Sequence, residues 1–170
     1  ARFVAVRGGP RIKPPVAQPA TKMAVALPPH TFCNSGEAPL SRSAMAGLRA
    51  GAGLVTLVGV DDVTAPDSVM TKQLRHPAEL AGFLEGKTAV VVGPGLGTGS
   101  VAIALVTQVL ATGVPAVLDA DALNLLAETP TLLASAAGPI VITPHPGEAA
   151  RLLDLTTAEV EADRLGAARA

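Results

Sequence analysis

Apolar runs of strand length alternate with longer segments of helical periodicity over most of the chain. The pattern predicts strands at residues 54–60, 89–92, 115–118 and 139–143, and helices at 44–52, 78–84, 101–110, 122–127, 148–153 and 158–170. The apolar runs are continuous rather than alternating, which is typical of strands covered on both faces. Strands that alternate with helices in this way predict an α/β fold with a parallel sheet.

The first 40 residues break this pattern. Residues 1–36 contain six prolines and five basic residues but no acidic residue. Each proline removes a backbone donor and disfavours helix at the residue before it, so we expect no regular element there. We interpret residues 1–40 as a poorly ordered, Pro-rich basic arm that precedes a folded part at 41–170. A targeting segment is the alternative, although the prolines interrupt the amphipathic helix that a transit peptide needs.

Composition excludes several classes of partner. Thirteen basic and fourteen acidic residues nearly balance, and only 2% of residues are aromatic, so we expect no nucleic-acid partner. No apolar run approaches the roughly 18 to 20 residues that span a bilayer, so we expect no membrane partner. Cys33 is the only cysteine, which excludes an intrachain disulfide and a cysteine-based zinc site. We therefore place the protein in the cytoplasm.

A glycine-rich loop at residues 93–99 follows the predicted strand 89–92. In open α/β sheets ligands bind beyond the carboxyl ends of the strands, and glycines let the backbone approach a ligand closely. The spacing fits neither the dinucleotide fingerprint nor the phosphate loop of nucleotide hydrolases. Gly95 and Gly97 are therefore candidate binding residues, with a tight turn that binds no ligand as the alternative.

The predicted strand 115–118 runs into Asp119, Asp121 and Asn124. Asp119 is expected at the ligand edge of the sheet, where its carboxylate is suited to orient a polar group of a substrate or a metal-bound water. No second acidic residue at ligand spacing supports a metal, so we predict no metal-binding residue. We interpret Asp121 as the cap of the following helix.

The predicted strand 139–143 is followed by His145, which stands between Pro144 and Pro146. Flanking prolines restrict the backbone, so the imidazole is presented from a rigid turn that suits a binding surface. A purely structural histidine is the alternative. Glu148 stands where the dipole of the next helix favours a carboxylate.

Four ordered motifs carry a family resemblance, at residues 48–56 (LRAGAGLVT), 91–97 (VVGPGLG), 117–124 (VLDADALN) and 142–148 (ITPHPGE). Together they resemble the ADP-dependent NAD(P)H-hydrate dehydratase family, from about residue 44 to residue 170. The resemblance implies a ribokinase-like parallel three-layer sandwich, present here incompletely. It also implies a lyase that repairs hydrated NADH or NADPH (NADHX or NADPHX), using ADP or ATP with Mg²⁺. The resulting candidate substrate-binding residues are Gly95, Gly97, Asp119, Asn124 and His145.

Two departures from the family pattern bear on activity. Ala38 and Pro39 stand where the family has a Gly-Ala pair at the substrate site. The family's lysine-containing nucleotide segment and its Gly-x-Gly-Asp turn are absent up to Ala170. The catalytic Asp of the family is therefore expected beyond Ala170, and we expect a truncated, inactive dehydratase domain that would form a homo-oligomer when complete. A fragment of a ribokinase-like small-molecule kinase and a non-catalytic nucleotide-binding remnant are the alternatives.

Overall fold

The computed structural model describes residues 4–5, 22–27, 39–60 and 65–170. In this part of the chain seven strands form one sheet in the order β1-β7-β6-β5-β2-β3-β4, and every pair is parallel except β1 with β7. The strands are β1 (Val4–Ala5), β2 (Lys22–Leu27), β3 (Leu54–Gly59), β4 (Met70–Gln73), β5 (Ala89–Val92), β6 (Ala116–Leu118) and β7 (Ile140–Ile142). The predicted parallel α/β sheet is thus confirmed, and the four predicted strands match β3, β5, β6 and β7.

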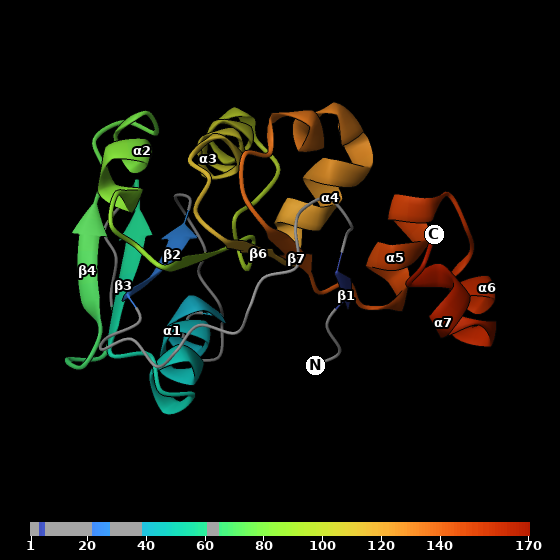
Figure 1. Ribbon diagram of the computed structural model, residues 1–170, viewed down its shortest axis with the longest axis horizontal. Helices are drawn as coiled ribbons and strands as arrows, with labels where there is room; N and C mark the ends of the chain where they lie inside the picture. Colours follow the sequence, from blue (N-terminus) through green and yellow to red (C-terminus); the bar gives the residue numbers. More distant parts are fainter. Residues whose placement is uncertain (1–3, 6–21, 28–38, 61–64) are drawn as a thin grey trace.

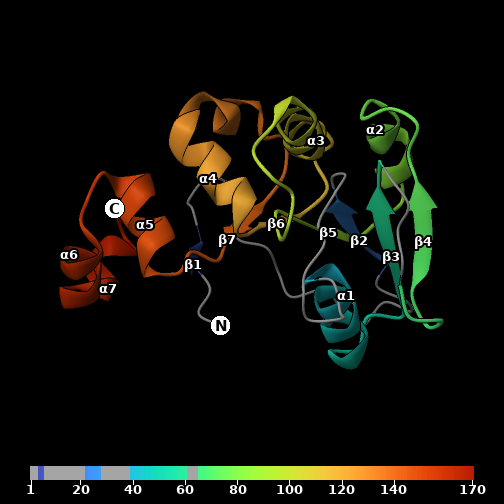
Figure 2. The same cartoon turned by 180° about the vertical axis from the view of Figure 1, so that it is seen from behind.

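Helices cover the sheet on both sides and make three layers. They are α1 (Pro39–Arg49), α2 (Glu79–Leu84), α3 (Ser100–Ala111), α4 (Asp121–Glu128), the 3-10 helix η1 (Pro130–Ser135), α5 (Pro146–Leu153), α6 (Thr157–Ala162) and α7 (Arg164–Ala167). Figures 1 and 2 show α1 on one face of the sheet, α2, α3 and α4 on the other, and α5 to α7 beyond β7. None of the helices in the described ranges is both long and apolar enough to cross a bilayer.

The prediction that residues 1–36 contain no regular element is wrong for β1 and β2. β2 lies in the middle of the sheet, hydrogen-bonded to β3 on one side and β5 on the other. Residues 23–27 are five consecutive apolar residues without proline or glycine, which suits a strand buried in a sheet. The high proline content of the surrounding segment concealed this short run. Residues 39–40 of the predicted arm begin α1, and the rest of the arm lies outside the described residues.

Other elements also differ from the prediction, in their bounds or in their presence. α1 begins earlier, at Pro39, because proline is well tolerated at the first position of a helix. β4 lies at one edge with all its residues exposed, so it shows no hydrophobic pattern. The predicted helix 158–170 is two short helices, α6 and α7, separated at Asp163, whose Oδ1 accepts a bond from the Gly166 amide.

The core lies on both faces of the sheet and is built from aliphatic side chains. Val90 and Val92 of β5 point into the larger cluster with α2, α3 and α4, whereas Val91 packs against the smaller cluster beneath α1. This alternation between two apolar layers explains the continuous apolar runs of the sequence. The large side chains that are fully buried are all leucines: Leu57, Leu74, Leu80, Leu84, Leu96, Leu105, Leu118, Leu123, Leu125 and Leu126.

Helix α3 offers a matched test of this core. Leu105 is 1% exposed and Ile103, on the outer face of the same helix, is 38% exposed. Leu105→Ala should lower the free energy of unfolding by about 2 to 5 kcal/mol because it leaves a cavity. Ile103→Ala should cost less than about 1 kcal/mol. Urea denaturation of both variants measures the difference, and equal losses would contradict this placement of α3.

Candidate functional site

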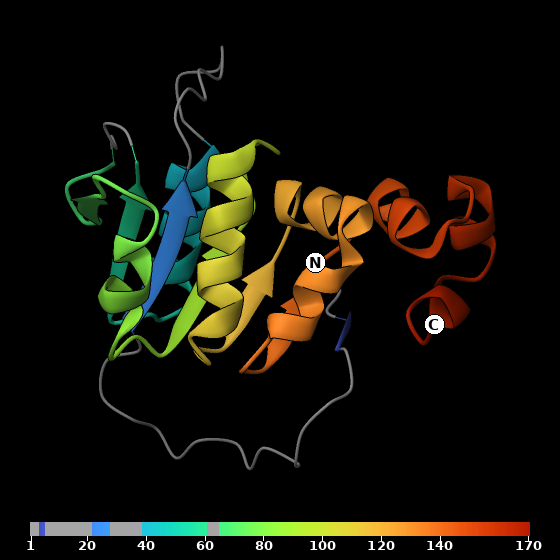
Figure 3. The same cartoon turned by 90° about the horizontal axis from the view of Figure 1, so that it is seen from above.

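The order in which successive strands are added to the sheet reverses between β2 and β5, although the two strands are parallel. The connection from β2 through α1 leads outward to β3, whereas β5, β6 and β7 follow one another in the opposite direction. Such a reversal opens a crevice beyond the carboxyl ends of the two strands, where α/β proteins bind ligands. Figure 3 shows β2 and β6 with their arrowheads at the same, upper edge of the sheet. The loops after β5, β6 and β7 lie side by side along this edge.

The loop after β5 depends on glycines with positive φ. Gly93, Gly95 and Gly97 have φ values of 128°, 66° and 68°, in the region that favours glycine. A Cβ on Gly93 would collide with the backbone oxygen of Asp119, so only glycine fits there. A Cβ on Gly97 would meet no atom of the described residues within 4 Å, and Gly97 is exposed. The backbone at Gly97 is therefore open at the edge where a ligand is expected.

The junction of β6 and α4 is a sharp turn at Ala120, whose φ of 48° is rare for a residue with a side chain. Asp119 is half-buried and directly follows β6, at the same edge as the glycine loop. The expectation that Asp121 caps α4 is wrong, because Ala120 holds the cap position and no side-chain bond caps it. Asp121 Oδ2 instead accepts a bond of 2.8 Å from the Gly97 amide. Asp121 thus ties the glycine loop to α4.

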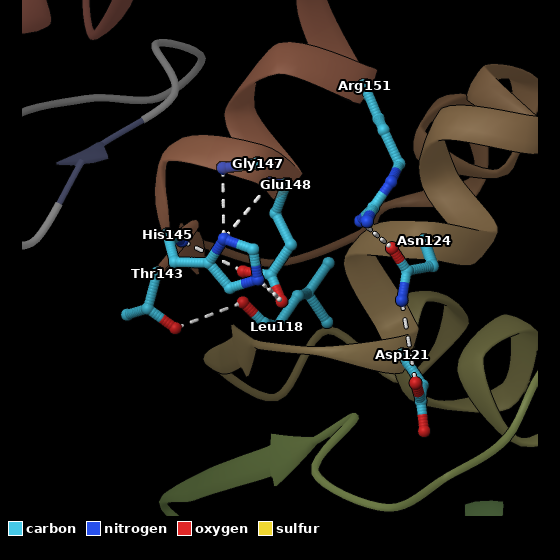
Figure 4. A network of polar contacts seen from close by, with 8 residues as sticks. All are labelled: Leu118, Asp121, Asn124, Thr143, His145, Gly147, Glu148 and Arg151. Carbon is cyan, nitrogen blue, oxygen red and sulfur yellow. Dashed lines mark hydrogen bonds and ion pairs between the residues drawn. The ribbon is translucent and has the colours of Figure 1, made fainter. Parts of the chain in front are cut away.

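Asn124 lies one turn further along α4 and connects to α5. Its Nδ2 lies 3.5 Å from Asp121 Oδ1, and its Oδ1 accepts a bond of 2.7 Å from Arg151 Nη1 (Figure 4). Both ends of the Asn124 amide therefore contact protein groups. Its prediction as a substrate contact stays a prediction, as does that of Asp119.

His145 holds the cap position of α5. Its Nδ1 accepts from the amides of Gly147 (3.0 Å) and Glu148 (3.3 Å), and Glu148 Oε2 accepts from the His145 amide at 2.8 Å. These reciprocal bonds form a capping box in which an imidazole replaces the usual hydroxyl. Thr143 fixes the start of this turn, because its amide and hydroxyl both donate to the carbonyl of Leu118 on β6 (Figure 4).

The surroundings of His145 limit what its imidazole does. Because Nδ1 accepts from two amides, a neutral ring carries its proton on Nε2, which lies 3.3 Å from Glu148 Oε1. A general base accepts a proton through a free lone pair, and the lone pair of this ring at Nδ1 already accepts the two amide bonds. The side chain is nevertheless 62% exposed. This geometry suits a ring that contacts a ligand while holding its own helix in place.

No metal centre lies at this edge in the described residues. No three carboxylate, imidazole or thiol side chains of the described part gather to hold a metal ion. A hollow of about 410 Å³ lies between α2 and α3, at the opposite edge of the sheet. Its lining contains none of the candidate residues, so we place the site at the carboxyl edge, where the loops converge.

Sequence reasoning missed three contributors to the site, namely Gly93, Asp121 as the partner of Gly97, and Arg151. Gly93 directly follows the apolar run, which is the signal of a close approach between backbones. The spacing of Asp121 and Asn124 places both on one face of a helix. Nothing in the sequence indicates Arg151, since its contact with Asn124 spans 27 residues.

The two glycines should respond differently to substitution. Gly97→Ala should cost about 1 to 2 kcal/mol, since only the left-handed backbone opposes the new methyl group. Gly93→Ala should cost more, because the methyl group would overlap the Asp119 carbonyl and move β6. Thermal unfolding of both variants checks the order, and a more stable Gly93→Ala variant would contradict the close approach.

The cap of α5 does not require an imidazole, because another side-chain acceptor can replace Nδ1 of His145. His145→Ala should destabilise the protein by about 1 kcal/mol because two amides of α5 lose their acceptor. His145→Asn should restore most of this loss, since the Asn oxygen is a good helix cap. Denaturant unfolding compares the two variants. Equal stability of the Ala and Asn variants would show that the imidazole does not cap α5.

Comparison with known proteins places this geometry in a family. The family model described as NAD(P)H-hydrate dehydratase matches residues 36–170. A bifunctional NAD(P)H-hydrate repair enzyme of Coxiella burnetii is 45% identical over 130 residues, which cover 74% of this chain and 26% of the relative. An ADP-dependent (S)-NAD(P)H-hydrate dehydratase of Neisseria meningitidis is 52% identical over 86 residues, covering 48% of this chain and 29% of the relative.

Solved structures agree on the fold. A ribokinase-like superfamily protein of Enterococcus faecalis has a TM-score of 0.68 at 20% identity, over 97% of this chain and 57% of that one. An ADP/ATP-dependent NAD(P)H-hydrate dehydratase of Bacillus subtilis, co-crystallised with ATP and Mg²⁺, has a TM-score of 0.61 at 22% identity, over 88% of this chain and 55% of that one. The chain spans roughly a quarter of the curated relatives and just over half of these structures. On the family match and the shared ribokinase-like fold, the chain belongs to the NAD(P)H-hydrate dehydratase family.

Proposed function

We propose that this chain forms the substrate-binding part of an ADP- or ATP-dependent (S)-NAD(P)H-hydrate dehydratase, a lyase that restores NADH or NADPH from its hydrate. The observation that carries the proposal is the convergence of the glycine loop after β5 and the His145 turn after β7 at one edge of the sheet. Family membership supports the same substrate. Gly97 and His145 would contact the hydrated dinucleotide, with Gly95 shaping the loop.

The start of α3 supports binding of a dinucleotide at this edge. Residues 97–100 are exposed, and in the described structure no side chain caps the first turn of α3. Free amides at a helix start carry partial positive charge, which favours the phosphate groups of a dinucleotide. The amide of Gly97 itself donates to Asp121. Ligand contact at Gly97 would therefore use its open Cα rather than its amide.

We assign no residue of this chain to the nucleotide or to Mg²⁺. The described residues gather no cluster that would hold a metal ion, and the lysine segment and Gly-x-Gly-Asp turn of the family are not among the 170 residues. When bound, the nucleotide would supply the phosphoryl group that makes the hydrate hydroxyl a better leaving group. The glycine loop after β5 and the His145 turn after β7 would bind and orient the substrate. A cytoplasmic location and a homo-oligomer stay predictions.

A glycine substitution that fits the backbone tests this proposal. Asn tolerates a positive φ better than other side chains, so Gly97→Asn should add bulk at the site with little loss of stability. Gly86→Asn is a matched control, because Gly86 has a φ of 70° and open space around its Cα but lies at the opposite edge. We expect Gly97→Asn to weaken binding of NADH hydrate at least about tenfold, or 1.4 kcal/mol, and Gly86→Asn to leave it unchanged. Isothermal titration calorimetry measures both.

Two other outcomes would contradict the proposal. Equal affinity of Gly97→Asn and the unmodified chain for NADH hydrate would show that the glycine loop is a simple turn without ligand contact. An unmodified chain that binds no hydrate would remove the substrate assignment altogether. His145→Asn adds an independent arm, since it keeps the cap of α5 but removes the ring; its affinity should fall while its stability holds.

A further inference from the structure

A continuous line of polar contacts joins the two loops of the proposed site along the partly exposed face of α4, which carries Asp121 and Asn124. Arg151 on α5 donates to Asn124 Oδ1 at 2.7 Å, Asn124 Nδ2 lies 3.5 Å from Asp121 Oδ1, and Asp121 Oδ2 accepts from the Gly97 amide at 2.8 Å. Figure 4 shows the three side chains in sequence between α5 and the start of α4. The line therefore runs from the helix that His145 caps to the loop that carries Gly97.

The chemistry of the three side chains allows only one arrangement. A guanidinium only donates hydrogen bonds and a carboxylate only accepts them, so Asn124 must turn its oxygen to Arg151 and its nitrogen to Asp121. The amide dipole then lies between a positive and a negative charge, which strengthens both contacts. With the Asn124 amide fixed in this way, Asp121 keeps its second oxygen aimed at Gly97.

Resting on the proposed function, we propose that Arg151, Asn124 and Asp121 are positioning residues that set the Gly97 loop relative to His145. They act on the loop through the Gly97 amide, which donates to Asp121. α4 and α5 pack against each other, so a contact between them transmits the position of one loop to the other. The two loops thereby face the substrate at a fixed separation. Less of the protein must then become ordered when the substrate binds, which lowers the entropic cost of binding.

Two substitutions break different links of this line. Arg151→Met removes the donor on an exposed residue and keeps an unbranched stem. Asn124→Asp keeps an acceptor for Arg151 but places a second carboxylate against Asp121, which breaks the middle link. Arg151→Lys keeps a donor and should restore part of the effect. Arg164→Met, an exposed arginine on α7, is the matched control.

The exchange rate of the Gly97 amide hydrogen, measured by NMR in the ligand-free protein, reports whether the bond from Gly97 to Asp121 is kept. Arg151→Met and Asn124→Asp should speed exchange at Gly97 about three- to tenfold, with the amides of Val91 and Val92 unchanged. NADH hydrate should bind more weakly by a similar factor. Arg164→Met should change neither quantity, and Arg151→Lys should lie between Arg151→Met and the unmodified chain.

The possible results separate this inference from the proposed function. Unchanged exchange at Gly97 in Arg151→Met overturns the positioning role, and faster exchange throughout the sheet shows a merely structural role. Faster exchange at Gly97 with unchanged hydrate affinity would show that the positioning of this loop is not important for substrate binding. If the unmodified chain binds no hydrate, the proposed function fails, while the exchange rates still decide whether Arg151 controls the loop.

Discussion

The contact between Gly93 and the carbonyl of Asp119 sets the geometry of the carboxyl edge. β5 and β6 are neighbours, and the chain segments that leave them approach so closely that a side chain at residue 93 would collide with the backbone of Asp119. Glycine at 93 removes the collision and lets the Asp119 amide bond to Val92, which extends the ladder beyond β6. This approach brings Gly97 within reach of Asp121, and the unusual backbone at Ala120 holds α4 in the matching direction.

The two loops of the site are held by opposite means. The loop after β5 is shaped by the absence of side chains, since its glycines adopt conformations that other residues resist. The turn after β7 is held by side chains, because His145 and Glu148 satisfy backbone amides that the helix start leaves unpaired. Thr143 adds a bond from its hydroxyl to the Leu118 carbonyl on β6. His145 therefore combines a structural bond at Nδ1 with an exposed ring. This combination explains why histidine, and not serine or aspartate, is useful at this cap.

The sequence predicted the fold class, four strands and the three loops that converge, because continuous apolar runs report burial on both faces of a sheet. It missed β2, where the surrounding prolines dominated the composition, and β4, whose exposed residues carry no pattern. In the site it indicated Gly97 and His145 correctly as residues of one edge. It did not indicate Arg151 or the role of Asp121, because these depend on contacts across 27 and 24 residues that local spacing does not encode.

The short strands at the two ends of the sheet bear on the behaviour of the molecule in solution. Among the described residues, β1 pairs two residues with β7 in the antiparallel sense, and β4 contributes four residues that include Lys72. Addition of a strand from another molecule needs a long, flat edge of unpaired backbone groups. A strand of two residues and a charged strand of four offer little of such an edge. Fibril-like growth from either end of this sheet is therefore disfavoured by its own outermost strands.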